Sequence, residues 1–135
     1  GQVRVVADHL NVSGGSLFPA PGLVSAGWDA TLTERLWSLR GVSGSSVVAL
    51  VPGPLRPSPA ESRALVSLGA DAAVTDSVAE VMVLASSGVA VSALTYLDAP
   101  AAGGNLGRAQ LSLRQASGVT LAAVEEILRS LRAGS

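Results

Sequence analysis

The stretch VPGPLRPSPAESRALVSLGADAAVTDSVAEVMVLASSGVAVSALTYLDA (residues 51–99) decides the fold class, because strand-like and helix-like segments alternate along it. ADAAVT (70–75) predicts a short buried strand, and VAVSALTYL (89–97), apolar at its start, predicts another. Between them, DSVAEVMVLASSG (76–88) carries the signals of a helix that stops at its glycine. This alternation is typical of α/β proteins, in which a largely parallel sheet carries helices on its faces.

The first helix of the stretch is marked at both ends by residues that suit helix ends. Ser58 precedes Pro59, a residue favoured in the first helical position, and Glu61 completes the spacing of a capping box. Gly69 predicts the end of this helix, since glycine readily adopts the left-handed conformation found there.

The sequence before residue 51 extends the same pattern. QVRVVADHL (2–10) is rich in β-branched residues and predicts a strand, and SSVVALVPG (45–53) predicts a second one. WDATLTERLWSL (28–39) predicts a helix with Asp29 in its first turn, where a carboxylate suits the helix dipole.

The C-terminal sequence VTLAAVEEILRSLRA (119–133) predicts an amphipathic helix. Its apolar residues recur at spacings of three and four, which brings them to one side of a helix. We expect that side to be buried against the sheet, and Glu125 and Glu126 to be solvated. The residues expected to be buried are Leu121, Val124, Leu128 and Leu131.

Length and composition predict one globular domain over residues 1–135, with 48% hydrophobic and 14% charged residues. We expect an α/β fold with a central mixed, largely parallel sheet flanked by helices. The formal net charge is −1, and the 9 basic residues, all arginine, are scattered, so no nucleic-acid partner is expected. No apolar run reaches the roughly 18–20 residues of a membrane span, so no membrane partner is expected either.

The chain has no cysteine, which excludes disulfides, thiolate catalysis and cysteine-ligated zinc. Its single histidine, His9, cannot form a multi-histidine metal site. We therefore expect no metal and no cofactor. The missing cysteines and the absence of a signal-peptide pattern lead us to expect a cytoplasmic setting.

Polar residues follow the first predicted strand, and ligands of α/β proteins bind outside the carboxyl ends of strands. Asp8, His9 and Asn11 could include a catalytic Asp–His pair or form a structural hydrogen-bonding cluster. Adjacent residues on a strand point to opposite faces, which favours the structural interpretation.

Three further residues allow two interpretations each. Asp76 could contact a ligand or, together with Ser77, cap the following helix, and capping is favoured. Trp28 and Tyr96 could stack on a base or fill the core. No dinucleotide-binding glycine motif, phosphate-binding loop or nucleophile elbow is present.

Taken in order, several motifs resemble the C-terminal part of the trimeric purine nucleoside phosphorylase family. VRVVADHLN (3–11) resembles the family's strand ending in Asp-His-Ile-Asn, and VSAGWDATL (24–32) resembles its Met-Ser-Asp-Ala-Tyr-Asp segment, with Trp28 in place of the tyrosine. A Gly-Pro turn, an Ala-Glu pair, a Leu-Gly-Ala-Asp-Ala run, a helix start bearing Glu and a strand start with Gly-x-x-Val follow. In this chain they are Gly53–Pro54, Ala60–Glu61, Leu68–Ala72, Ser77–Glu80 and Gly88–Val91.

The resemblance implies a phosphorylase-like fold and a family activity, the cleavage of a purine nucleoside's N-glycosidic bond by phosphate, which serves as co-substrate. It implies no catalytic residue within this chain. The family's main phosphate loop would lie upstream of Gly1, so we expect a fold truncated on its N-terminal side. The candidate substrate-binding residues carried over by the resemblance are Trp28, Thr75, Asp76, Tyr96 and Asp98.

Several of these positions depart from the family pattern. Thr75 replaces a sugar-facing methionine, and Pro57 replaces the glutamate that grips the purine. Asp76 replaces a serine that touches phosphate, and a carboxylate about 4 Å from a phosphate charge costs on the order of 4 kcal/mol at an effective dielectric constant of 20. The base-reading asparagine falls near Ala99, and a one-residue slip puts Asp98 there.

The motifs that match the family are turns and helix starts that shape the fold, whereas the positions that differ are those that contact substrate in the family. The leading hypothesis is therefore a non-catalytic phosphorylase-like domain that serves protein interaction or assembly. Its partner would be itself or another chain. One alternative is an active phosphorylase whose N-terminal half is supplied elsewhere, by another chain or by a part of the protein outside this sequence. A further alternative is a sensor that binds a purine or nucleoside without turnover.

Overall fold

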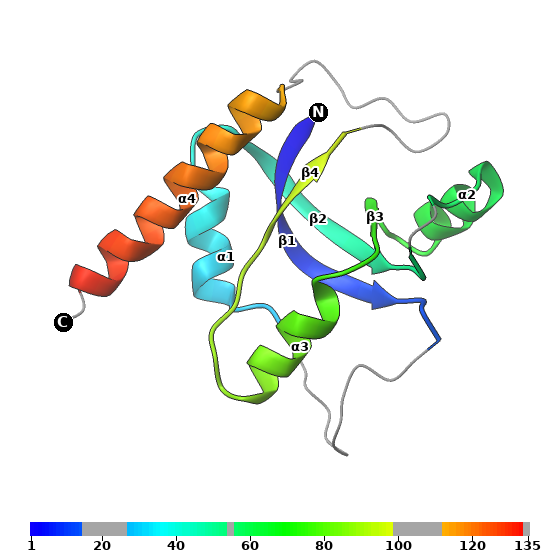
Figure 1. Cartoon of the computed structure of the whole chain (residues 1–135), viewed down its shortest axis with the longest axis horizontal. Helices are drawn as coiled ribbons and strands as arrows, with labels where there is room; N and C mark the ends of the chain where they lie inside the picture. The colour runs from blue at the N-terminus through cyan, green and yellow to red at the C-terminus, as the bar shows by residue number, and fades with distance from the viewer. Residues whose placement is uncertain (15–26, 54–55, 99–111, 134–135) are drawn as a thin grey trace.

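The computed structural model describes residues 1–14, 27–53, 56–98 and 112–133, which fold into a four-stranded sheet with helices around it (Figure 1). The strands are β1 (Gln2–Asn11), β2 (Val42–Leu50), β3 (Ala72–Val74) and β4 (Leu94–Leu97). The helices are α1 (Ala30–Trp37), α2 (Pro59–Ser67), α3 (Val78–Ser86) and α4 (Leu113–Ala133).

The strands lie in the order β3-β2-β1-β4. β1 is parallel to β2 and β2 is parallel to β3, with α1 and α2 as the crossover helices. β4 is antiparallel to β1, with Gln2 opposite Leu97. The predicted α/β fold with a mixed, largely parallel sheet is therefore confirmed.

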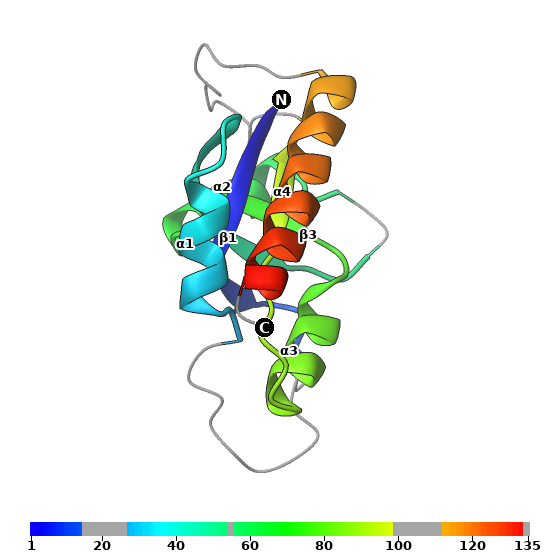
Figure 2. The same cartoon turned by 90° about the vertical axis from the view of Figure 1, so that its left-hand side faces the viewer.

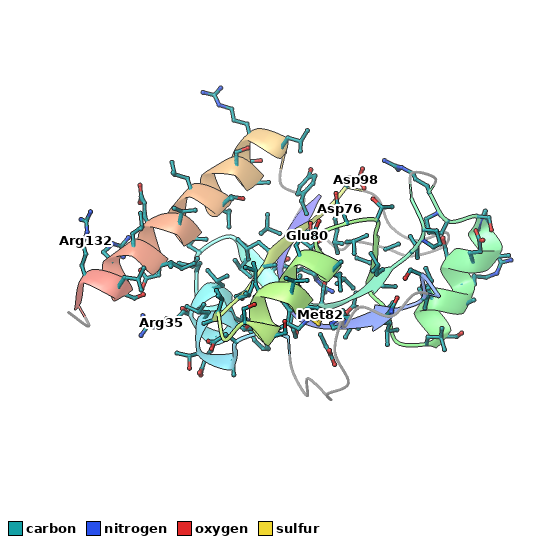
Figure 3. The ribbon with its side chains drawn as sticks, turned by 60° about the horizontal axis from the view of Figure 1, so that its bottom comes forward. Arg35, Asp76, Glu80, Met82, Asp98 and Arg132 are labelled. Carbon is teal, nitrogen blue, oxygen red and sulfur yellow. The ribbon has the colours of Figure 1, made fainter. Side chains whose placement is uncertain are left out.

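Neighbouring residues of β1 point to opposite faces and meet different helices. Val5 packs against Leu36 of α1 and Ala123 of α4. Val6 packs in a second cluster that includes Met82 of α3. Consequently α1 and α4 cover one face of the sheet and α3 covers the other (Figures 2 and 3).

The predicted ends of α2 are confirmed. Ser58 Oγ accepts a hydrogen bond from the Glu61 amide at 3.3 Å, and Glu61 Oε2 accepts one from the Ser58 amide at 2.7 Å. These bonds to the charged form lower the pKa of Glu61 from its ordinary value. Gly69, with φ of +92°, follows the helix in the left-handed conformation.

Two strands differ in extent from the prediction. β2 begins at Val42, opposite Val3, instead of at residue 45. β4 covers only Leu94–Leu97, although residues 89–97 were expected to be a strand. The carbonyl of Val91 accepts a hydrogen bond from the Asp29 amide at 2.7 Å, and that of Ala93 accepts one from the Val6 amide at 2.8 Å. The segment before β4 is therefore held by isolated backbone hydrogen bonds and not by a continuous β-ladder.

α4 begins at Leu113 instead of residue 119. Its start carries a capping box, in which Ser112 Oγ accepts from the Gln115 amide at 3.3 Å and Gln115 Oε1 accepts from the Ser112 amide at 2.9 Å. Gly118 lies inside the helix, where glycine normally weakens helical structure. For this reason the sequence analysis started the helix after Gly118 and missed its first turns.

The predicted buried face of α4 is wrong. Leu121, Val124, Leu128 and Leu131 are 61%, 49%, 49% and 64% exposed. The helix packs on the sheet through smaller residues instead, namely Ala116, Val119 and Ala123. Their size permits a close approach, since a Cβ on Gly41 would lie 2.6 Å from Cγ2 of Val119.

Candidate functional site

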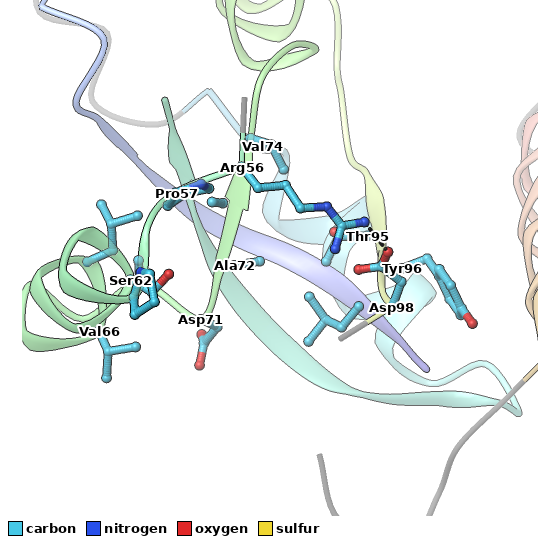
Figure 4. A pocket seen from close by; sticks show the side chains of 15 residues that line it. Arg56, Pro57, Ser62, Val66, Asp71, Ala72, Val74, Thr95, Tyr96 and Asp98 are labelled. Atoms are coloured by element: carbon cyan, nitrogen blue, oxygen red, sulfur yellow. Dashed lines mark hydrogen bonds and ion pairs between the residues drawn. The ribbon is translucent and has the colours of Figure 1, made fainter. Parts of the chain in front are cut away.

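A pocket of about 550 Å³ opens between α2, β3 and the end of β4 (Figure 4). Its volume lies within the range of small-molecule pockets, about 300–1,000 Å³. The segment between β2 and α2 contributes Arg56 and Pro57, and β4 contributes Thr95 and the following Asp98. The remaining lining residues come from α2 and β3 and their flanking turns, and they include Ser62, Leu65, Val66, Asp71 and Val74.

An ion pair joins two of the segments that line the pocket. Arg56 donates a hydrogen bond from a terminal guanidinium nitrogen to Asp98 Oδ2 at 3.0 Å (Figure 4). The two side chains are 81% and 60% exposed, so water screens their attraction. The pair therefore contributes little to stability and is open to exchange with a ligand.

The second carboxylate of the pocket, Asp71, connects three strands. Its side chain accepts a hydrogen bond from the Val47 amide at 2.8 Å, and its own amide donates to the Val47 carbonyl at 2.8 Å. Its Oδ1 lies 3.5 Å from a guanidinium nitrogen of Arg4 on β1. These contacts fix the start of β3 beside β2, which is a structural role.

The chemistry that this pocket can perform is limited by its side chains. Both of its carboxylates are paired with arginines, and among the described residues no histidine or cysteine lines it. Prolines, alanines and branched apolar side chains form much of the wall. The arrangement offers hydrogen bonding and apolar contact to a ligand, without a nucleophile held by a base.

Two of the five predicted substrate-binding residues line the pocket. Asp98 faces it from the end of β4. Tyr96 contributes to the lining, but its ring is directed away from Arg56 and Asp98 in Figure 4 and packs against a cluster that contains Val3 and Val119. Ala99, the alternative base-reading position, lies outside the described residues.

Thr75 and Asp76 follow β3 and are exposed outside the pocket lining. Thr75 lies beside Gly53, where a Cβ would be 3.0 Å from the threonine Cβ. Ser77 is the N-cap of α3, one of the two predicted positions, but it makes no side-chain cap bond. Asp76 Oδ1 instead accepts from Ser77 Oγ at 3.1 Å, and Ser77 has a φ of +69°.

Trp28 is buried in the core cluster that includes residues of α3, at 8% exposure, and is not part of the pocket lining. Its Nε1 donates to Nδ1 of His9 at 3.2 Å, with the two rings at 69°. Asp8 Oδ1 accepts from the backbone amide of His9 at 2.8 Å, and Asn11 Oδ1 accepts from Ser13 Oγ at 2.7 Å. Asp8, His9 and Asn11 thus each accept a hydrogen bond, from three different donors.

Within the part of the chain that the structure describes, no group of three or more His, Cys, Asp or Glu side chains could hold a metal ion. None of the described helices combines the length and apolar character needed to cross a membrane.

The roles of Arg56 and Asp71 at the pocket were missed by the sequence reasoning. The sequence analysis gives Arg56 no role, and its partner Asp98 is 42 positions away. Asp71 was read only as part of the Leu-Gly-Ala-Asp-Ala motif. A signal was available for Asp71, because a carboxylate directly before a predicted strand can accept a hydrogen bond from the neighbouring strand.

No protein-family model matches the sequence, and no curated protein matches it. Solved structures do share the fold. Purine nucleoside phosphorylase from Schistosoma mansoni in complex with BCX-34 matches with a TM-score of 0.71 at 19% sequence identity, over 95% of this chain and 52% of that chain.

Two Schistosoma purine nucleoside phosphorylase structures match similarly. The complex with hypoxanthine has a TM-score of 0.73 at 19% identity, over 95% of this chain and 55% of that chain. The complex with guanosine has a TM-score of 0.70 at 20% identity, over 95% of this chain and 54% of that chain. This chain thus spans about half the length of the chains it matches, and the predicted resemblance is confirmed at the level of the fold.

Proposed function

We propose that this chain is a non-catalytic domain with a purine nucleoside phosphorylase-like fold, and that it works by binding a protein surface. The observation that carries the proposal is the apolar stripe of α4, defined as Leu121, Val124, Leu128 and Leu131, each about half exposed or more. Large apolar side chains that gather on one side of a surface helix are typical of interaction sites. We propose that this binding takes place in the cytoplasm, because the chain has no cysteine and disulfides are typical of oxidising compartments.

The state of the pocket supports a non-catalytic role. Asp98 is engaged by Arg56, and Asp71 is engaged by Arg4 and the Val47 amide. Of the residues carried over from the family, Thr75 and Asp76 are outside the pocket lining, and Trp28 is in the core. A phosphorylase must position phosphate, sugar and base together, and these residues do not gather in one place.

A second candidate function is purine binding without turnover. It is favoured by the exposed carboxylate of Asp98 in a pocket of suitable volume, and by the hypoxanthine and guanosine complexes of the structural neighbours. An active phosphorylase, completed by a half supplied elsewhere, is the third. Both require Asp98 to exchange Arg56 for a ligand.

Two measurements test the proposal. Calorimetric titration with hypoxanthine, guanosine and inorganic phosphate, followed by analysis of base release from guanosine, is expected to give no heat of binding and no free base. Binding that the Asp98→Asn variant loses would favour the sensor, and base release would favour the enzyme.

The second measurement compares the size of the chain in an extract of cells that produce it with its size after purification. We expect elution from a size-exclusion column at more than the monomer mass in at least one of the two. The Leu121→Glu variant is expected to elute as a monomer, and the Leu113→Glu variant, altered at a 71% exposed position of the same helix, to elute like the parent. A parent chain that is monomeric in both samples contradicts the proposed function.

A further inference from the structure

We infer that the partner of the α4 stripe is the same stripe on a second copy of this chain, with the two helices antiparallel. This inference rests on the proposed function and names its partner. Three features of α4 support it, namely the spacing of the stripe, the charges beside it and its position in the fold.

The spacing is that of a helix seam. From Leu121 the next members of the stripe follow after three, four and three residues, which is the apolar repeat that packs one helix against another. The residues that hold α4 to its own sheet, such as Ala116 and Ala123, lie on a different side of the helix. The seam is therefore formed and exposed in the single chain.

The same spacing is unchanged when read in the opposite direction. A two-fold axis level with Glu126 superimposes the stripe on itself, so that Leu121 meets the partner's Leu131 and Val124 meets the partner's Leu128. Such a self-complementary patch forms a closed dimer, in which both copies use the same residues. A partner of unrelated sequence would have no reason to match this symmetry.

Charges beside the stripe complement each other in this arrangement. Glu125 and Arg129 are one turn apart on the same flank of α4, and Arg129 is paired with Glu126 within the chain. With the axis level with Glu126, Arg129 lies about 3 Å along the helix axis from the partner's Glu125. Along the flank the order is the partner's Arg129, Glu125, the partner's Glu125 and Arg129, so each glutamate has an arginine of the other copy on one side and a glutamate on the other.

The position of α4 leaves the stripe open to a second copy. The helix runs along one flank of the molecule, and in both views the described elements that cover it lie on its sheet side (Figures 1 and 2). Four apolar side chains from each copy make an interface at the small end of the usual range, so the dimer should form in a concentration-dependent way.

Sedimentation equilibrium of the purified full chain between about 1 μM and about 1 mM tests the association. We expect a shift from the monomer mass to twice that mass. Leu121→Glu would place two carboxylates in the apolar seam and should raise the dissociation constant on the order of 100-fold. Leu113→Glu makes the same chemical change on the same side of α4 but two turns before Leu121. In this arrangement Leu113 lies past the partner's Ala133, so the constant should stay unchanged, with circular dichroism confirming that both variants fold.

Disulfide trapping tests the direction of the helices, because the chain has no cysteine of its own. An oxidised equimolar mixture of Val124→Cys and Leu128→Cys is expected to give mainly the mixed disulfide, identified by mass. Predominance of the two homodisulfides indicates parallel helices and overturns the antiparallel arrangement.

The remaining outcomes separate this inference from the proposed function. A purified chain that stays monomeric at all concentrations overturns self-association. If the extract then still contains a larger complex that Leu121→Glu abolishes, the proposed function stands with a different partner. A dimer that Leu121→Glu leaves intact overturns the role of the stripe.

Discussion

Trp28 donates a hydrogen bond from its indole nitrogen to Nδ1 of His9, which joins the segment before α1 to the end of β1. The bond requires a neutral imidazole with its proton on Nε2, because a protonated imidazole offers only donors. The indole is almost fully buried, so the loss of its acceptor leaves a donor unsatisfied.

Removal of the acceptor should therefore loosen this contact. His9→Phe keeps a ring at this position without an acceptor, and we expect the free energy of unfolding to fall by about 1–3 kcal/mol, the cost of a buried donor left without a partner. The measurement is urea unfolding followed by circular dichroism. In a Trp28→Phe background, which lacks the donor, His9→Phe should cost less, and an equal cost would contradict this assignment.

The capping box of α2 gives the stability of the fold a dependence on pH. The pKa of Glu61 is lowered in the folded chain by its bonds with Ser58. Its contribution is therefore complete above the ordinary pKa of glutamate and is lost as the pH falls through the lowered value. Glu61→Gln should remove this part of the dependence, as measured by urea unfolding at several acidic pH values, with Glu80→Gln as an uncapped control.

The backbone of Ser77 provides a test of local strain. A serine with φ of +69° and ψ of −31° adopts a conformation that favours glycine. Ser77→Gly should raise the free energy of unfolding by about 0.5–1 kcal/mol, the relief of strain being partly offset by the greater freedom of the unfolded chain. Ala79→Gly, inside α3, should lower it by about 1 kcal/mol. Destabilisation by both would show that the Ser77 side chain matters more than its backbone.

The two carboxylates of the pocket should differ in their effect on stability. Asp71→Ala removes a charged acceptor from the Val47 amide and should cost about 2 kcal/mol. Asp98→Ala breaks only the exposed pair with Arg56 and should cost less than about 0.5 kcal/mol. Chemical unfolding of both variants checks the contrast, and similar losses would mean that Asp98 also supports the fold.

Local chemistry made much of the fold predictable. Ser58, Pro59 and Glu61 set the start of α2, and Gly69 and Gly88 mark the ends of α2 and α3 because they adopt positive φ. These signals act within a few residues, so the sequence alone carries them. The strand order and the antiparallel β4 depend on long-range pairing, which the sequence analysis did not predict.

The face of α4 could not be predicted for a physical reason. Spacing shows that Leu121 and Leu128 share a side of the helix, but it does not show what covers that side. Ala116 and Ala123 form a second apolar side, and the close approach at Gly41 selects it. Nor could the pocket have been assembled from sequence, because Arg56 and Asp98 meet only once the chain has folded.

The use of small residues between α4 and the sheet also sets how firmly this helix is held. Docking through Ala116, Val119 and Ala123 removes less apolar surface from water than docking through leucines would, so we expect α4 to open locally while the strands stay paired. Such local opening makes its amides exchange with solvent earlier than those of β1 and β2. A binding partner that covers the outer leucines would suppress this opening. Association and the local stability of α4 are then thermodynamically linked, so that each strengthens the other.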